Sequence, residues 1–142
     1  MVPLPRRRSS PPLPSARDLG LPRSARGLYD RLCSEPVGDW ERLLRECREH
    51  VADFEAALAT NEFLPIAEAR ALAEAMPRLV ERAREHPKRA LAEHLAWIAA
   101  RYFVIKDDGA HDFVVVGLDD DVAVYNAVVR HLEAPELALD LS

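Results

Sequence analysis

The distribution of proline most constrains what this chain can fold into. The sequence has 11 prolines in 142 residues, and those at positions 3, 5, 11, 12, 14 and 22 precede residue 23. Proline lacks the backbone amide that a helix interior requires, so residues 1–23 are expected to form an extended or disordered tail. The later prolines are isolated, and each is expected to start, kink or end a helix.

Apolar residues recur at helical spacing between these later prolines. The clearest case is residues 39–59, with an apolar stripe at Trp40, Leu43, Leu44, Cys47, Val51, Phe54 and Leu58. Positions three and four apart lie on one face of an α-helix, so this segment is predicted to be a long amphipathic helix. Asp39 is a suitable N-cap residue, because its carboxylate can accept hydrogen bonds from free amides.

The same pattern predicts further helices. They cover residues 24–34, 65–76, 88–105 and about 119–132. Pro77 is expected either to kink the second of these or to begin a new helix that runs to about residue 85. The segment 88–105 is the most hydrophobic, and it is predicted to be the central helix.

These segments predict an all-α fold, a small bundle of four to six short helices with a disordered Pro/Arg-rich N-terminal tail. The chain length suits a single domain, here residues 24–134, between the tail (1–23) and a C-terminal tail (135–142). The N-terminus has no apolar signal segment, and no apolar run approaches the ~20 residues of a membrane span. We therefore expect a cytoplasmic protein.

The basic tail is one candidate site for a protein partner. The formal net charge of the whole chain is -5, which argues against general affinity for nucleic acid, yet the tail is rich in arginine. The pattern Arg8-x-x-Pro11-x-x-Pro14 is typical of peptides that SH3-type domains bind, although a solvated tail is the simpler interpretation. The candidate residues in this tail are Arg6, Arg7, Arg8, Pro11 and Pro14. Binding of RNA or DNA by the tail is a less favoured alternative.

A second candidate is the run of aspartates in residues 107–121. Its carboxylates and imidazole offer ligands for Mg²⁺, Mn²⁺ or Ca²⁺, with the candidate set Asp108, His111, Asp112, Asp120 and Asp121. The spacing differs from that of an EF-hand loop. The simpler interpretation is structural. The later aspartates cap a helix and face the positive end of its dipole, and the earlier ones hydrogen-bond turn amides. Our first expectation is therefore no cofactor.

The aromatic and aliphatic residues of segment 95–105 form a third candidate. Short helices that fail to bury all of them would leave an apolar patch for a partner or for self-association. Trp97, Arg101 and Tyr102 are the candidate partner-binding residues of this face.

Catalytic motifs are not apparent. His94 lies near the edge of the apolar stripe and is predicted to be a hydrogen-bonded core or boundary histidine. Glu46, Glu49 and His50 are predicted to form a solvated helix face. Cys33 and Cys47 form no CxxC pair, and buried thiols are the default expectation, with a disulfide between them left open.

The C-terminal half resembles the YkvA-like family of bacterial domains of unknown function. The features that carry the resemblance are Pro77, Pro87 and the Tyr102-Phe103-Val104 stretch, followed by Asp108 and Asp112 at turn positions and by Gly117, Asp120 and Asp121. The turn prolines of that family are absent, and the likeness covers residues 76–132 only. It implies a small helical domain and no particular activity.

We therefore expect a non-enzymatic protein-interaction module, an adaptor or accessory subunit that docks on a larger protein assembly through a helical face, its basic tail or both. The alternative is a divalent-metal-dependent enzyme or metal sensor built on the aspartates of residues 107–121.

Overall fold

The computed structural model describes residues 13–60, 65–105 and 118–140, which form five α-helices and one short 3-10 helix. The helices are α1 (Arg23–Cys33), α2 (Trp40–Ala57), α3 (Ile66–Arg84), α4 (Arg89–Ile105), α5 (Asp119–His131) and η1 (Pro135–Leu137). The described ranges contain no β-strand. The predicted all-α bundle of four to six helices is therefore confirmed.

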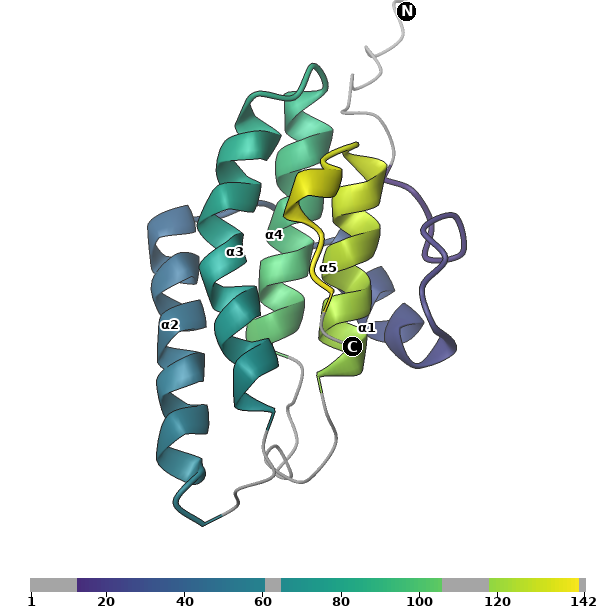
Figure 1. Cartoon of the computed structure of the whole chain (residues 1–142). Coiled ribbons are helices and arrows are strands. Elements are labelled where there is room, and N and C mark those ends of the chain that lie inside the picture. The colour runs from purple at the N-terminus through teal and green to yellow at the C-terminus, as the bar shows by residue number, and fades with distance from the viewer. Residues whose placement is uncertain (1–12, 61–64, 106–117, 141–142) are drawn as a thin grey trace, which may run out of the picture.

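Helix α4 lies at the centre of the bundle and packs against α1, α2, α3 and α5 (Figure 1). Leu95, Ile98 and Phe103 are fully buried, which agrees with the high hydrophobicity of this segment. Helices α2 and α3 flank α4 on one side, and α5 and α1 cover the other. Among the described helices, none combines the length and apolar content that are needed to cross a membrane.

Helix α2 begins as its sequence predicts. The Asp39 carboxylate accepts hydrogen bonds from the amides of Glu41 (3.0 Å) and Arg42 (3.2 Å), two of the free donors at the helix start. The face toward the bundle buries Leu43, Cys47 and Phe54. Both predictions for this helix, the Asp39 cap and the buried apolar face, are therefore confirmed.

Pro77 neither ends α3 nor starts a new helix, because α3 continues from Ile66 to Arg84 with the proline inside it. The apolar stripe explains this continuity. Leu72 and Met76 before the proline, and Leu79 and Val80 after it, are all buried against the rest of the bundle. Burial of one uninterrupted stripe outweighs the loss of one helical hydrogen bond.

The prediction that the tail extends to residue 23 is wrong for residues 13–22. Ala16, Leu19 and Leu21 are buried in the core. A local turn orders this segment, since the amide of Asp18 donates to the Ser15 hydroxyl at 2.9 Å. Residues 1–12, the rest of the predicted tail, lie outside the described residues.

The C-terminal segment is also part of the packed structure as far as residue 140. The Tyr125 hydroxyl donates to the carbonyl of Leu137 at 2.8 Å. Asn126 donates to the carbonyl of Leu139 at 2.9 Å and accepts from its amide at 2.8 Å. Residues 135–140 therefore follow α5 back along the bundle, rather than leaving it as a tail.

Candidate protein-interaction surface

The expected apolar patch on segment 95–105 is absent from the described surface. Trp97 is 7% exposed and Tyr102 is 3% exposed, so both belong to the core. Among the described residues, Val37 is the one large hydrophobic side chain that is exposed. The interpretation of Trp97 and Tyr102 as an exposed partner-binding face was wrong, because the α1–α2 connection and α5 cover α4.

Arg101, the third residue of that predicted face, is engaged within the chain by Glu35. One carboxylate oxygen of Glu35 accepts from Nε of Arg101 at 2.5 Å and from Nε1 of Trp97 at 2.9 Å, and the other accepts from Arg101 at 3.1 Å. His94 Nε2 donates to the Glu35 carbonyl at 2.8 Å. The predicted boundary role of His94 is therefore confirmed.

The electrostatics of this cluster follow from its geometry. The hydrogen bond from Arg101 lowers the pKa of the Glu35 carboxyl, against the opposing effect of burial. Helix α4 thus contributes three donors to one loop residue. The hydrogen bonds of Glu35 with His94, Trp97 and Arg101 therefore hold the α1–α2 connection against the central helix.

A pocket of about 300 Å³ adjoins Glu35, and its charged groups already have partners. It is lined by Glu35, Gly38, Asp39, Arg42, Leu43, Glu46, Trp97 and Arg101. Arg42 pairs with Glu46 at 3.3 Å, Glu35 pairs with Arg101, and Asp39 caps α2. The pocket therefore brings together no free acid, base or nucleophile for catalysis.

Of the five predicted metal ligands, the described residues include two, Asp120 and Asp121. Asp120 accepts a hydrogen bond from the Ser24 hydroxyl at 2.9 Å, and Asp121 is 2% exposed. Asp108, His111 and Asp112 lie outside the described residues, as does the apolar run 113–116. The described part of the chain holds no group of three or more His, Cys, Asp or Glu side chains that could bind a metal ion.

The aspartates at the start of α5 do not occupy its N-cap position. Leu118 is the N-cap residue, and its side chain makes no cap hydrogen bond. Asp119, Asp120 and Asp121 lie in the first turn, where negative charge is favourable at the positive end of the helix dipole. Their position therefore suits the predicted interaction with the helix dipole.

Of the tail candidates, only Pro14 is described, and it is packed. Its carbonyl accepts a hydrogen bond from the Tyr29 hydroxyl at 2.6 Å. Tyr29 is fully buried, and this burial raises its pKa above the ordinary value. Arg6, Arg7, Arg8 and Pro11 lie outside the described residues.

His50 differs from the prediction of a solvated helix face. Its ring lies edge-on to Phe103, with ring centroids 4.9 Å apart, and to Phe54, with centroids 5.1 Å apart.

Cys33 and Cys47 are free thiols, the first half-buried and the second buried. Burial raises the pKa of Cys47 to about 12, so this thiol is protonated at neutral pH.

The surface that sequence reasoning missed lies between α2 and α3. A groove of about 360 Å³ is lined by Leu44, Arg48, Val51, Glu55, Arg70, Ala73, Glu74 and Pro77, which we call the α2–α3 groove. On α2 the lining residues are spaced three and four apart, and on α3 they lie three or four apart except for the adjacent pair Ala73 and Glu74, so each helix contributes a single stripe. The two helices run side by side along the edge of the bundle (Figure 1).

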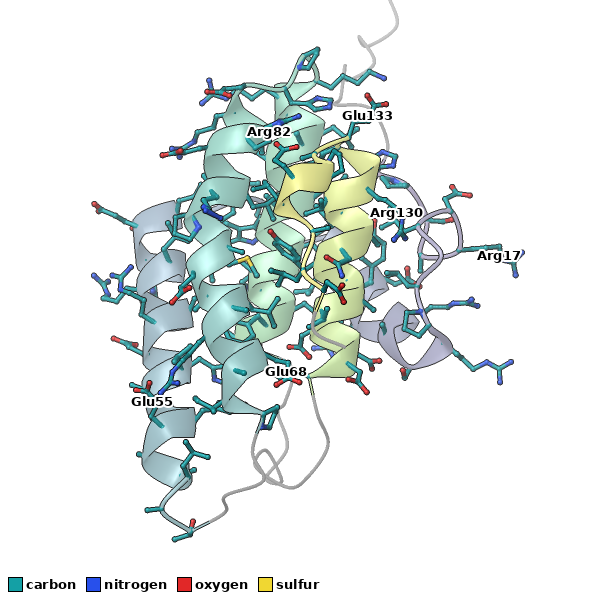
Figure 2. All side chains as sticks on the ribbon, in the orientation of Figure 1. Arg17, Glu55, Glu68, Arg82, Arg130 and Glu133 are labelled. Carbon is teal, nitrogen blue, oxygen red and sulfur yellow. The ribbon has the colours of Figure 1, made fainter. Side chains whose placement is uncertain are left out.

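The α2–α3 groove has an apolar floor and a charged rim. Leu44, Val51 and Ala73 pack against the core but are only half-buried. At one end, Arg70 of α3 pairs with Glu55 of α2 at 2.8 Å; Glu55 is labelled near the lower end of α2 in Figure 2. A signal was present in the sequence, since Leu44 and Val51 make the apolar stripe of α2 wider than the buried face needs.

Two charges on the rim have no ion-pair partner among the described residues. They are Arg48 on α2 and Glu74 on α3, and both are exposed. Each helix therefore presents one exposed charge beside the apolar floor, and the two charges are opposite in sign.

Pro77 adds a polar feature to the same groove. Having no amide hydrogen, it cannot donate the helical hydrogen bond to the carbonyl of Ala73, four residues earlier. Ala73 and Pro77 both line the groove. A backbone acceptor without its usual helical donor thus belongs to the turn of α3 that borders the groove.

Comparison of the chain with protein-family models, with curated proteins and with solved structures found no match. The candidate surface therefore has to be interpreted from its own chemistry.

Proposed function

We propose that this protein is a non-enzymatic interaction module, an adaptor or accessory subunit that binds protein through the α2–α3 groove. The observation that carries the proposal is the half-buried apolar floor of Leu44, Val51 and Ala73 between charged rims. The resemblance to the YkvA-like family remains part of this proposal, and it adds no activity.

The chemistry of the groove favours a protein partner over a small metabolite. Its apolar residues follow two helices lengthwise, which suits an elongated apolar stripe such as that of another helix. The rim charges suit the polar border that surrounds the apolar centre of protein interfaces. The α1–α2 pocket offers no comparable surface, because its charged groups are already paired.

The basic N-terminal segment is a second proposed contact. Arg6, Arg7 and Arg8 would meet an acidic surface of the larger assembly, where a short arginine run is recognised mainly through its charge. In this arrangement the groove provides the apolar contact and the arginines orient the module.

Site-specific photo-crosslinking tests the proposal in the full-length chain. A photoreactive amino acid at position 73, in the groove, should give protein adducts in cells of the source organism that mass spectrometry can identify. The matched control is the same amino acid at Asp53, an exposed position of α2 that does not line the groove. A second arm replaces Arg6, Arg7 and Arg8 together with alanine, and it should reduce the yield of the adduct.

The absence of any adduct specific to position 73 would contradict the proposal, as would equal adducts at both positions. An unchanged yield in the arginine variant would show that the tail does not contribute to binding, and the proposal would then rest on the groove alone.

A further inference from the structure

We infer that the protein bound in the α2–α3 groove is a second copy of this chain. The inference rests on the proposed function, because it takes the groove to be a protein-docking surface and names its occupant. The observation that points to a second copy is the pair of opposite charges, Arg48 on α2 and Glu74 on α3, that lack an ion-pair partner in the described ranges.

The heights of these two charges along the groove can be compared from the Glu55–Arg70 ion pair. That pair, at 2.8 Å, marks a level shared by the two antiparallel helices. With a rise of 1.5 Å per residue, Arg48 lies about 10.5 Å from that level along α2, and Glu74 lies about 6 Å from it along α3. Both are displaced in the same direction, so their heights differ by about 4.5 Å, within the reach of an arginine side chain.

A two-fold axis parallel to the groove satisfies both charges at once. Such an axis places α2 of each copy over α3 of the other at the same height. Arg48 of one copy then faces Glu74 of its partner, and the reverse pair forms by symmetry. An interface between identical patches requires this self-complementarity, and two-fold dimers are the commonest closed assembly of soluble proteins.

The apolar floor fits the same arrangement. Leu44 and Val51 of one copy would lie against Ala73 and Pro77 of the other, so larger side chains on α2 meet smaller ones on α3. All four residues are half-buried or exposed in the single chain. A partner of uniformly acidic or basic character would instead leave one of the two rim charges opposed by a like charge.

Charge reversal followed by mixing is the decisive experiment, using the full-length protein. Sedimentation velocity on the wild-type chain across a concentration series should show a dimer. Arg48→Glu alone and Glu74→Arg alone should each weaken dimerisation by roughly tenfold, because each substitution removes two ion pairs and creates two like-charge contacts. An equimolar mixture of the two variants should restore the dimer, since both cross-chain pairs are again opposite in sign.

The control is Glu49→Arg, an exposed position of α2 outside the groove, which should leave dimerisation unchanged. Circular dichroism checks that every variant is folded. A wild-type chain that stays monomeric would overturn the inference, as would a dimer indifferent to both reversals or a mixture that fails to recover.

These results separate the inference from the proposed function. If the chain is monomeric but the crosslinker at position 73 captures a different protein, the groove is a docking surface and the second copy is not its occupant. If it captures nothing, both proposals fail.

Discussion

At the scale of single residues, Glu35 connects more of the structure than any other described side chain in the α1–α2 connection. It accepts hydrogen bonds from Trp97 and Arg101 through its carboxylate and from His94 through its carbonyl. All three donors come from α4, so one loop residue positions the start of α2 against the central helix. The groove depends on this placement, because α2 forms one of its walls.

Glu35→Gln should destabilise the fold by about 1 kcal/mol at neutral pH, since a neutral amide replaces a half-exposed carboxylate bonded to a cation. The folded-state pKa of Glu35 is lowered from the ordinary value of 4.5. A lowered pKa means that the ionised carboxylate stabilises the folded state above the unfolded pKa, and that this contribution is lost as the pH falls through the folded value. The difference between wild type and variant should therefore shrink below pH 4.5.

Urea unfolding at neutral and acidic pH measures this difference, with Glu49→Gln, an exposed residue of α2, as the matched control. A difference that stays constant with pH would show that the Glu35 charge contributes nothing, and that only the shape of the side chain matters.

Gly38 provides a second test at the residue scale. A Cβ atom at this position would lie 3.2 Å from Cη2 and 3.4 Å from Cζ2 of Trp97. Trp97 cannot easily move, because its ring contacts Trp40 and its Nε1 donates to Glu35. Gly38→Ala should therefore cost about 1 kcal/mol through overpacking.

Gly27→Ala is the matched substitution, because Gly27 lies inside α1 and its Cβ would meet nothing within 4 Å. It should stabilise the protein by about 0.5–1 kcal/mol through helix propensity. Thermal unfolding of both variants should thus shift in opposite directions, and a stabilising Gly38→Ala would refute the close packing described.

Sequence reasoning reached some of these residues and missed others for a physical reason. Asp39 and His94 were placed correctly, since a cap and a boundary position depend on local spacing. Glu35 was not singled out, because its partners are 59 to 66 positions away in the chain. Local periodicity carries no information about which distant donors meet a loop carboxylate.

At the scale of elements, Pro77 shows how packing overrides a local rule. Sequence reasoning left open a kink or a new helix at Pro77, and the continuous α3 from Ile66 to Arg84 rules out the new helix. The continuous buried stripe on both sides of the proline holds the helix together. Proline in this position still removes one helical hydrogen bond, so it lowers the stability of α3 locally, next to the groove.

Pro77→Ala should therefore raise the free energy of unfolding by about 2 kcal/mol. Alanine restores the amide donor to the Ala73 carbonyl and has the higher helix propensity, while part of the gain is offset because proline restricts the unfolded chain. Denaturant unfolding at a fixed protein concentration measures the change. Lower stability in the variant would mean that the proline ring itself makes packing contacts that outweigh the missing hydrogen bond.

In segment 13–22, by contrast, sequence reasoning predicted disorder where the chain is ordered and packed. Its prolines, and the many arginines around it, favoured disorder, but Leu19 and Leu21 are buried, and Ser15 and Asp18 form a local turn. Composition averaged over the first 23 residues concealed these apolar positions. The boundary of the packed domain was therefore predicted too late in the sequence by about ten residues.

At the scale of the whole molecule, the fold class and the central position of α4 followed from the apolar periodicity of the sequence. The α2–α3 groove did not, because a groove depends on how far two helices leave their apolar stripes uncovered. Segment 95–105 has more aromatic residues than α2, yet it is the segment that the bundle buries. Leu44 and Val51 stay half-buried, since α2 lies at the edge of the bundle.

We propose that the α2–α3 groove binds protein, with a second copy of the chain as its occupant. Backbone amide NMR spectra of the ¹⁵N-labelled protein, recorded over a dilution series, test this proposal without any substitution. Resonances of Arg48, Val51, Ala73 and Glu74 should shift together with concentration, while those of Tyr125 and Asn126 in α5 should not. Spectra that are independent of concentration, or shifts confined to α1 and α5, would contradict it.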